Sequence, residues 1–298
     1  MARTRLRGIS IAGIQIGIEV PEIYDWEWPE SPVSEFQCLP RDPEVHVGLR
    51  VDAPAQADLG GERYSIGAWT FEVARLGGGD WVLGLSRRGR REKLARFDGE
   101  FRVGEIVVSA DIARSRAYPL RSPIDEWIVL HRTVARGGLC LDGSATSIDG
   151  AARIRLGDAP ARPGNRWTVP TPSLLGRRAL LVREERDRSR LFRTPWTESM
   201  DPRLSFEARI DAFERICDSE IDWSDRLDPA DAADLLVKHA LVPLCDEGML
   251  DRVLRNAQRI ARDTCVLERG VVPDTCDASS PNDPSWLATG AAFASPQG

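Results

Sequence analysis

The chain has 298 residues, of which 42% are hydrophobic and 29% are charged. This balance is typical of a folded globular protein and excludes a wholly disordered chain, and the length allows one large domain or two of ordinary size. The formal net charge of −6 argues against a general nucleic-acid-binding protein, because such proteins carry an excess of positive charge that neutralises phosphates.

The sequence contains no run of about 18 apolar residues, so we expect no membrane-spanning helix. Its start combines a basic head with an apolar stretch, as a signal peptide does. However, the isoleucines from Ile9 to Ile18 mostly alternate with small or polar residues, which favours a strand. The six cysteines include no C-x-x-C pair, so zinc-ligand spacing is absent and we expect reduced thiols. These features predict a cytoplasmic protein without a metal site.

Residues 1–112 are predicted to form a β-rich N-terminal domain. After the isoleucine-rich strand, residues Val45–Val51 alternate between apolar and polar side chains, which is typical of a half-buried strand. Glycine-rich stretches at Gly77-Gly78-Gly79-Asp80 and around Gly89 indicate hairpin turns. Further strands are expected at residues 64–73, 81–85, 93–97 and 105–108.

An acidic, proline-broken loop follows the first strand and carries Trp26 and Trp28. Tryptophan is enriched at the centres of protein interfaces, so this loop is a candidate docking surface for a partner. The alternative, and the more ordinary interpretation, is that both tryptophans fold back onto the sheet.

A polar link is expected at residues 113–121, and a helix is predicted to begin after Ser122. Ser122 is a suitable N-cap, Pro123 suits the first helical position, and two acidic residues lie in the first turn. One face carries apolar residues at helical spacing together with His131, which we interpret as a core histidine rather than a catalytic base. Gly137-Gly138 ends the helix.

The next stretch forms a strand–turn–strand–loop unit, with a turn at Asp149-Gly150 and a loop that opens at Gly157. Together with the preceding helix, this unit resembles the HPr kinase/phosphorylase-like proteins, which belong to the phosphoenolpyruvate-carboxykinase-type P-loop enzymes. In that family a Leu-His-Gly motif precedes a phosphate loop of the type G-D/P-S-G-x-G-K-S/T. Here Leu141-Asp142-Gly143 stands at the first motif, and the eight residues GDAPARPG, 157–164, stand at the second.

The residues that would hold phosphate in such a loop are replaced. A phosphate loop wraps backbone N–H groups around the phosphates, neutralises them with a lysine and holds magnesium with a hydroxyl. Each proline here removes an N–H and fixes φ, so this nest cannot form in the same way. The resemblance therefore implies a degenerate loop. Gly157 and Asp158 are retained, Pro160 and Arg162 stand at inner glycines, Pro163 stands at the lysine, and Gly164 stands at the hydroxyl.

The resemblance also implies a helix and an acidic pair beyond the loop, and neither is retained in the sequence. Residues 166–173 contain two prolines, which are incompatible with a regular helix. Arg177 and Arg178 stand at the acidic pair in a gapless alignment; a shift of three residues would place leucines there instead. Neither arginine nor leucine side chains supply the oxygen ligands that magnesium needs. A later Thr194-Pro195-Trp196 segment resembles one found in bacterial HPr-kinase-related proteins linked to peptide-modification clusters.

The C-terminal part is predicted to contain three helices and a strand, so the fold class is α+β: a β-rich domain followed by an HPr-kinase-like mixed core at residues 118–277. A tail at residues 278–298 is expected to be loosely ordered. The last helix is expected to bury Met249, Leu250, Val253, Leu254, Ala257, Ile260 and Ala261. The helices are expected at residues 205–219, at 229–242 after the cap Asp228, and at 247–262, and the strand at 265–267.

Family members transfer phosphate from ATP to a serine of a carrier protein or peptide, which the resemblance would imply here. Because the lysine, the hydroxyl, the acidic pair and the motif histidine are all missing, we expect no ATP cofactor and no turnover. We expect instead a pseudokinase that binds, scaffolds or regulates a protein or peptide partner. Association of the chain into a homo-oligomer is a further possibility.

The alternatives are a surviving ATP-dependent kinase or an enzyme with altered chemistry. In the second case arginines bind a phosphorylated or carboxylated ligand, with Asp142 or Asp158 as an acid or base. The opposing interpretation is a solvated rim of paired charges. The arginines that converge on the old phosphate site in the alignment are Arg155, Arg162, Arg166, Arg177 and Arg178.

Overall fold

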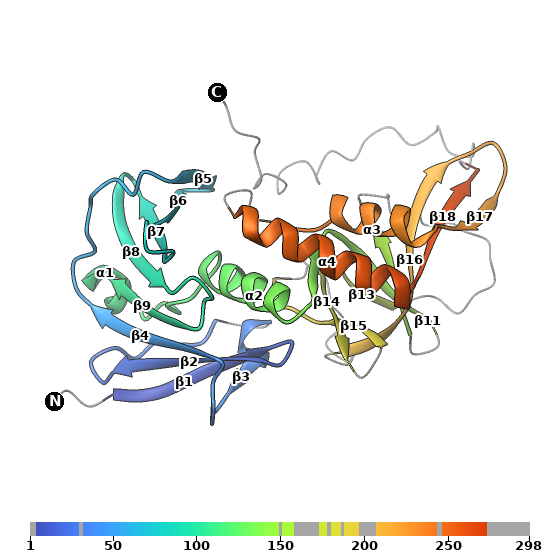
Figure 1. Ribbon diagram of the computed structural model, residues 1–298. Helices are drawn as coiled ribbons and strands as arrows, with labels where there is room; N and C mark the ends of the chain where they lie inside the picture. The colour runs from blue at the N-terminus through green and yellow to red at the C-terminus, as the bar shows by residue number, and fades with distance from the viewer. Residues whose placement is uncertain are drawn as a thin grey trace, which may run out of the picture. The chain divides into compact units, whose positions relative to one another are not determined.

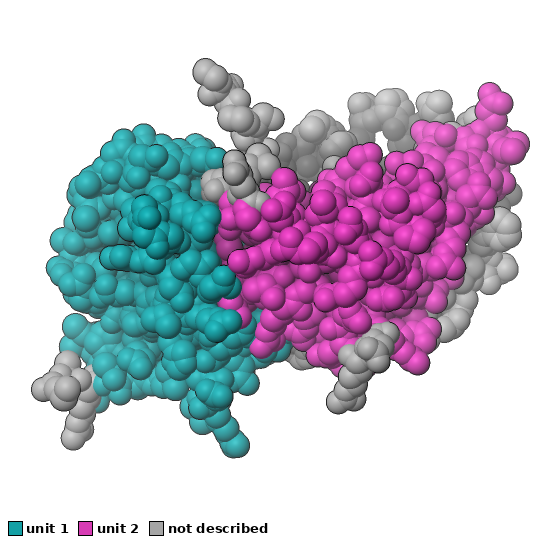
Figure 2. Space-filling view, viewed as in Figure 1, with its two compact units in different colours: residues 1–129, 276–298 teal, residues 130–275 magenta. Residues whose placement is uncertain are grey.

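The computed structural model describes residues 4–29, 32–148, 151–157, 173–177, 180–185, 188–196, 207–242 and 246–272 (Figure 1). The described chain is an α+β protein, as the sequence predicts. It divides into two compact units between residues 129 and 130 (Figure 2). This division falls inside a helix, whereas the sequence had indicated a boundary in the link between residues 112 and 118. The expected tail at residues 278–298 lies outside the described residues. None of the described helices is long and apolar enough to cross a membrane.

The first unit is built on one curved sheet of nine described strands, in the order β3-β1-β2-β4-β9-β8-β7-β6-β5 (Figure 1). Strand β4 runs parallel to β2 and β9, and every other pair is antiparallel. The strands are β1 (Thr4–Ile11), β2 (Ile14–Pro21), β3 (Gln37–Cys38), β4 (Val45–Val51), β5 (Glu62–Ile66), β6 (Trp69–Arg75), β7 (Trp81–Arg87), β8 (Arg90–Phe97) and β9 (Val103–Val108). A 3₁₀ turn η1 (Val33–Phe36) precedes β3, and the helices are α1 (Ala110–Arg114) and α2 (Ile124–Ala135).

Tight turns divide two of the expected strands into hairpins. The isoleucine-rich segment reverses at Ala12 and Gly13, whose φ angles of 51° and 71° are in the left-handed region that two-residue hairpin turns require. The expected strand at 64–73 likewise turns at Gly67, which has φ of 59°. The hairpin turns expected at Gly79 and Gly89 are confirmed, because β6 pairs with β7 and β7 pairs with β8. The link expected at residues 113–121 is partly helical, since α1 occupies its start.

Two glycines let the chain cross the β1–β2 hairpin. Gly8 and Gly17 are register partners. A Cβ at Gly8 would lie 2.8 Å from Cγ of Pro40, and a Cβ at Gly17 would lie 2.7 Å from Cγ of Pro43. The segment after β3, which pairs with β1, therefore passes over these glycines to reach β4 on the far side of β2.

Charged groups are buried in the core of this unit. Nη2 of Arg91 lies 2.6 Å from a carboxylate oxygen of Glu72, and each side chain is only 5% exposed. Lys93 is also buried, and its Nζ donates hydrogen bonds to the carbonyl oxygens of Tyr118 at 3.3 Å and Pro119 at 2.9 Å. Such groups are tolerated in a core only when their hydrogen bonds are satisfied.

The second unit is built on another sheet of nine described strands, and α3 and α4 pack on one of its faces (Figure 1). The main strand order is β10-β14-β15-β16-β12-β11-β13, and β18 extends the sheet beside β16 with β17 beyond it. The strands are β10 (Leu139–Leu141), β11 (Gly143–Ile148), β12 (Ala151–Leu156), β13 (Ser173–Arg177), β14 (Leu180–Glu185), β15 (Arg188–Phe192), β16 (Glu207–Asp218), β17 (Trp223–Arg226) and β18 (Cys265–Val271). The helices are α3 (Pro229–Lys238) and α4 (Glu247–Asp263).

The helix expected at residues 205–219 is wrong, because this segment is strand β16. Ile210, Phe213 and Cys217 recur at spacings of three and four, which suits a helix, but the segment pairs in parallel with β12 on one side and β18 on the other. These strand partners satisfy its backbone groups and bury Ile210 and Phe213 in the core. Tertiary pairing therefore overrides an ambiguous local pattern.

The other C-terminal elements agree with the sequence except at their ends. The Asp228 side chain accepts hydrogen bonds from the N–H groups of Ala230 and Asp231, which confirms the predicted cap. Helix α3 stops at Lys238 rather than at 242, because the following backbone pairs with β10: Leu241 N–H donates to Cys140 O at 2.8 Å. On α4 the predicted apolar side is buried, apart from Leu250 and Leu254, which are exposed. Strand β18 extends to residue 271 instead of ending at 267.

Candidate functional site

The second unit brings the carboxyl ends of its parallel strands to one edge. Strands β12, β16 and β18 all run in the same direction. Ligands of open α/β sheets bind in the crevice outside the carboxyl ends of parallel strands. Gly157 directly follows β12 at this edge, and it is the first residue of the sequence segment that resembles a phosphate loop. The edge is therefore the candidate site to test.

Three segments meet at Gly157. Its N–H donates to Asp142 O at 3.4 Å, and Asp142 N–H donates to the carbonyl oxygen of His239 at 2.8 Å. Gly157 has φ of 79°, and a Cβ built there would lie 3.0 Å from Cε1 of His239. The imidazole at the end of α3 therefore packs against the first glycine of the loop, and a side chain at this position would be both strained and crowded.

A cluster of arginines surrounds one carboxylate on the face of the sheet that lies opposite the helices. Ile154 and Leu156 of β12 enter the helix-covered core, so Arg153 and Arg155 lie on the other face. Nη1 of Arg153 and Nη1 of Arg269 each lie 3.5 Å from the same oxygen, Oε1 of Glu214, which is buried. We call Arg153, Arg155, Arg269 and Glu214 the arginine cluster.

Arg155 occupies an unusual place in this cluster. It is the register partner of Glu214, yet its side chain forms no hydrogen bond or ion pair with any residue that the structure describes. Its Nε is buried without a hydrogen-bond partner. Burial lowers the pKa of the Arg155 guanidinium; Glu214 raises that pKa and Arg269 lowers it. A partly desolvated guanidinium that lacks a hydrogen-bond partner at Nε is suited to bind an anionic group.

The register of the sheet also connects Arg155 with another predicted residue. Ser144 of β11 pairs with Arg155 on one side and with Arg177 of β13 on the other. Backbone positions 177, 144, 155 and 214 therefore form one row across four strands. The predicted convergence of the arginine side chains stays a prediction. The remaining predicted residues lie outside the described parts of the chain: Asp158, Pro160, Arg162, Pro163, Gly164, Arg166 and Arg178.

Three members of the arginine cluster were missed from the sequence: Arg153, Glu214 and Arg269. Arg153 alternates with Arg155 in the stretch A-R-I-R-L, and this pattern indicates that both occupy the same face of a strand. Arg269 carries no such local signal. It reaches the cluster because β18 pairs with β16, a strand far away in the sequence, in a register that begins with Ala212 opposite Cys265.

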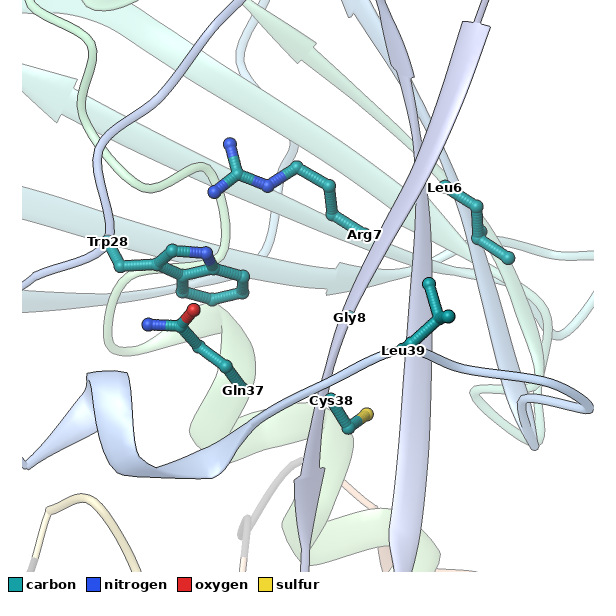
Figure 3. Close-up of a pocket in the computed structure, with 7 residues that line it drawn as sticks. All are labelled: Leu6, Arg7, Gly8, Trp28, Gln37, Cys38 and Leu39. Carbon is teal, nitrogen blue, oxygen red and sulfur yellow. The ribbon is translucent and has the colours of Figure 1, made fainter.

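The two tryptophans considered as a docking surface have different environments. Trp26 is only 1% exposed and packs beside Tyr24, Trp28 and Tyr118, so it belongs to the core and not to a surface. The fold-back interpretation is therefore correct for Trp26. Trp28 is half-buried and lines a pocket in the first unit (Figure 3).

Other residues singled out from the sequence have structural surroundings. His131 is buried on α2, with Nε2 3.7 Å from Oδ2 of Asp246, in agreement with a core histidine. Thr194 of the Thr-Pro-Trp segment is fully buried. Within the described ranges, no group of three or more histidine, cysteine, aspartate or glutamate side chains is arranged to hold a metal ion.

Comparison with known proteins adds no assignment. No protein-family model matches this chain, and no curated protein sequence matches it. The HPr-kinase-like relationship therefore rests on the motifs of the sequence and stays a prediction.

Proposed function

We propose that this protein is an HPr-kinase-like pseudokinase that binds a protein or peptide partner and does not turn over ATP. The observation that carries this proposal is the composition of the candidate edge. Guanidinium groups stand on the strands that lead to the loop after Gly157, and the loop sequence lacks both the lysine and the hydroxyl of a phosphate loop.

The charges at this edge oppose magnesium-dependent phosphoryl transfer. That reaction depends on positioned phosphates, a metal ion and carboxylates free to bind the metal. Glu214 is the carboxylate of the arginine cluster, and its Oε1 is already shared by Arg153 and Arg269. A buried carboxylate committed to two guanidinium groups is a poor magnesium ligand.

A retained scaffold without catalytic groups is suited to a binding role. The second unit keeps a continuous sheet covered by two helices, and its first described hairpin, β11–β12, is intact. Protein partners recognise such rigid surfaces without any requirement for a nucleotide.

Arg155 supports a second candidate, a site for a small phosphorylated or carboxylated ligand. Its Nε has no hydrogen-bond partner, and the charge of Arg269 is close enough to lower its pKa, so an anion placed there would meet two positive charges. Whether this site serves an altered enzyme or a sensor depends on what it binds.

Isothermal titration calorimetry of the purified full chain distinguishes these candidates. We expect no heat with Mg·ATP or ADP at millimolar concentration. Micromolar nucleotide binding would overturn the pseudokinase proposal. A parallel titration with inorganic phosphate tests the second candidate, with Arg155→Gln as the variant and Arg209→Gln, which changes an exposed arginine on β16, as the matched control. Phosphate binding that Arg155→Gln alone removes would favour a small-anion site.

A further inference from the structure

The first unit has an open sheet edge at its N-terminal strand. Strand β1 pairs with β2 along its whole length, from Thr4 to Ile11. On its other side, β3 pairs only with Gly8 and Ile9. Residues Thr4–Arg7 therefore have no strand partner on that side within the described chain. Unpaired backbone groups on an edge strand are a template for another extended chain.

A pocket of about 310 Å³ lies beside this edge, where β3 ends. Leu6 and Arg7 point to opposite sides of β1, Arg7 toward the indole of Trp28 and Leu6 toward the side on which Leu39 lies (Figure 3). Leu39 is 78% exposed and Leu6 is 40% exposed. The edge thus offers an apolar contact on one side of the strand and an aromatic, cationic contact on the other. Gly8, Gln37 and Cys38 complete the lining.

Arg7 gives the pocket its charge. Its guanidinium lies 4.2 Å from the ring centre of Trp26 and 5.0 Å from that of Trp28, and Nη1 donates to Trp26 O at 2.8 Å. Burial raises the pKa of the Cys38 thiol, which is therefore neutral at pH 7. Arg7 is the only charged side chain among the residues that line the pocket.

The neighbouring charges leave the edge positive. Arg5 lies on the same face of β1 as Arg7, and both pair with Asp25, Arg7 at 3.6 Å. Arg116 also pairs with Asp25 at 3.2 Å and with Glu27 at 2.9 Å, so three guanidinium groups and two carboxylates leave one positive charge. A second copy of this chain is disfavoured as the occupant, because antiparallel pairing of two β1 edges would place arginines opposite arginines.

We infer that residues Thr4–Arg7 and the adjoining pocket bind an extended, acidic segment of a partner protein by β-strand addition. Backbone pairing requires an extended chain, a carboxylate side chain complements Arg5 and Arg7, and an apolar side chain on the other face contacts Leu6 and Leu39. This inference rests on the proposed partner-binding role and gives that role a surface. It does not depend on the state of the nucleotide site.

The test uses the full chain and a synthetic capped peptide of alternating valine and glutamate. The matched control peptide replaces each glutamate with lysine. We expect the acidic peptide to bind, to quench or shift tryptophan fluorescence, and to protect backbone amides within Thr4–Arg7 from hydrogen exchange. Equal binding of the lysine peptide, or no binding of either peptide at millimolar concentration to the folded protein, would overturn the inference.

Two surface variants locate the binding. Leu39→Glu places a negative charge at the pocket, and Ile23→Glu makes the same change at an 83% exposed residue that does not line it. We expect Leu39→Glu to weaken acidic-peptide binding by about tenfold and Ile23→Glu to change it less than about twofold. Equal effects would overturn the inference, as would concentration-dependent dimers that Leu39→Glu abolishes. Titration of the same samples with Mg·ATP tests the pseudokinase proposal separately.

Discussion

The buried ion pair of the first unit provides a sharp test of its core. Arg91 and Glu72 are each 5% exposed, and Nη1 of Arg91 also donates to the carbonyl oxygens of Ala55 at 2.8 Å and Ala57 at 2.6 Å. A Cβ at Gly84 would lie 2.7 Å from Nε of Arg91, so the guanidinium fills the space that this glycine leaves. The pair therefore fixes the segment before β5 to the sheet.

Removing one partner should cost far more than removing both. Arg91→Met leaves Glu72 as a buried carboxylate, and Glu72→Leu leaves Arg91 as a buried cation; each should lower the free energy of unfolding by about 3–5 kcal/mol. Both losses should lie near the lower limit, because each remaining group keeps other hydrogen bonds. Glu72 still accepts from Leu59 N–H at 3.0 Å and from Arg63 at 3.3 Å, and Arg91 still donates to two carbonyl oxygens. In the double variant no unpaired charge is left, so its loss should not exceed that of either single variant.

Urea denaturation followed by tryptophan fluorescence measures these free energies, and the four proteins form a double-mutant cycle. Arg63→Met is the matched control, because Arg63 contacts the same carboxylate at 3.3 Å from an exposed position and should barely change the unfolding midpoint. If the two single losses simply add in the double variant, the charges are not coupled and the reasoning is refuted.

Two further predictions concern Lys93 and Asn256. Burial lowers the pKa of Lys93 to about 8, with Asp125 and Glu92 raising it and Arg121 lowering it. The lysine of the unfolded chain therefore binds more protons than that of the folded chain between pH 8 and pH 10.5, the ordinary pKa of lysine. The stability of the wild type relative to Lys93→Met should rise by about 3 kcal/mol across that interval and stay flat below pH 8; a flat difference throughout would contradict this. Asn256 Nδ2 donates to Val134 O at 2.9 Å and Gly138 O at 3.0 Å, so Asn256→Leu should lower the free energy of unfolding by about 1–3 kcal/mol, and an unchanged urea midpoint would show that water replaces both bonds.

The sequence predicted those parts of the fold that local chemistry determines. The turns at Gly79 and Gly89 and the cap at Asp228 depend on residues within a few positions of each other, and all three are confirmed. Strand β16 was predicted as a helix, because its apolar spacing fits both structures and its partners β12 and β18 lie far away in the chain. Patterns within one segment cannot show which distant strand will pair with it.

The candidate site was also predicted only where residues close together in the sequence determine it. Arg155 and Arg177 were expected to converge; the register places their backbone positions in one row across the sheet, two strands apart, and the convergence of their side chains stays a prediction. Arg269 joins the cluster only through the pairing of β18 with β16, which no local pattern reveals. Trp26 was a candidate for a surface, yet its ring packs among aromatic side chains contributed partly by residue 118, also distant in sequence.

The arrangement of β12 separates the side chains that build the core from those that could contact a ligand. Ile154 and Leu156 supply the helix-covered core, whereas Arg153 and Arg155 alternate with them on the opposite face. A change of side chain on the polar face of β12 therefore does not remove a contact from the buried face. The fold of this unit therefore carries no information about catalysis, and direct titration with nucleotide is the test of the proposed pseudokinase role.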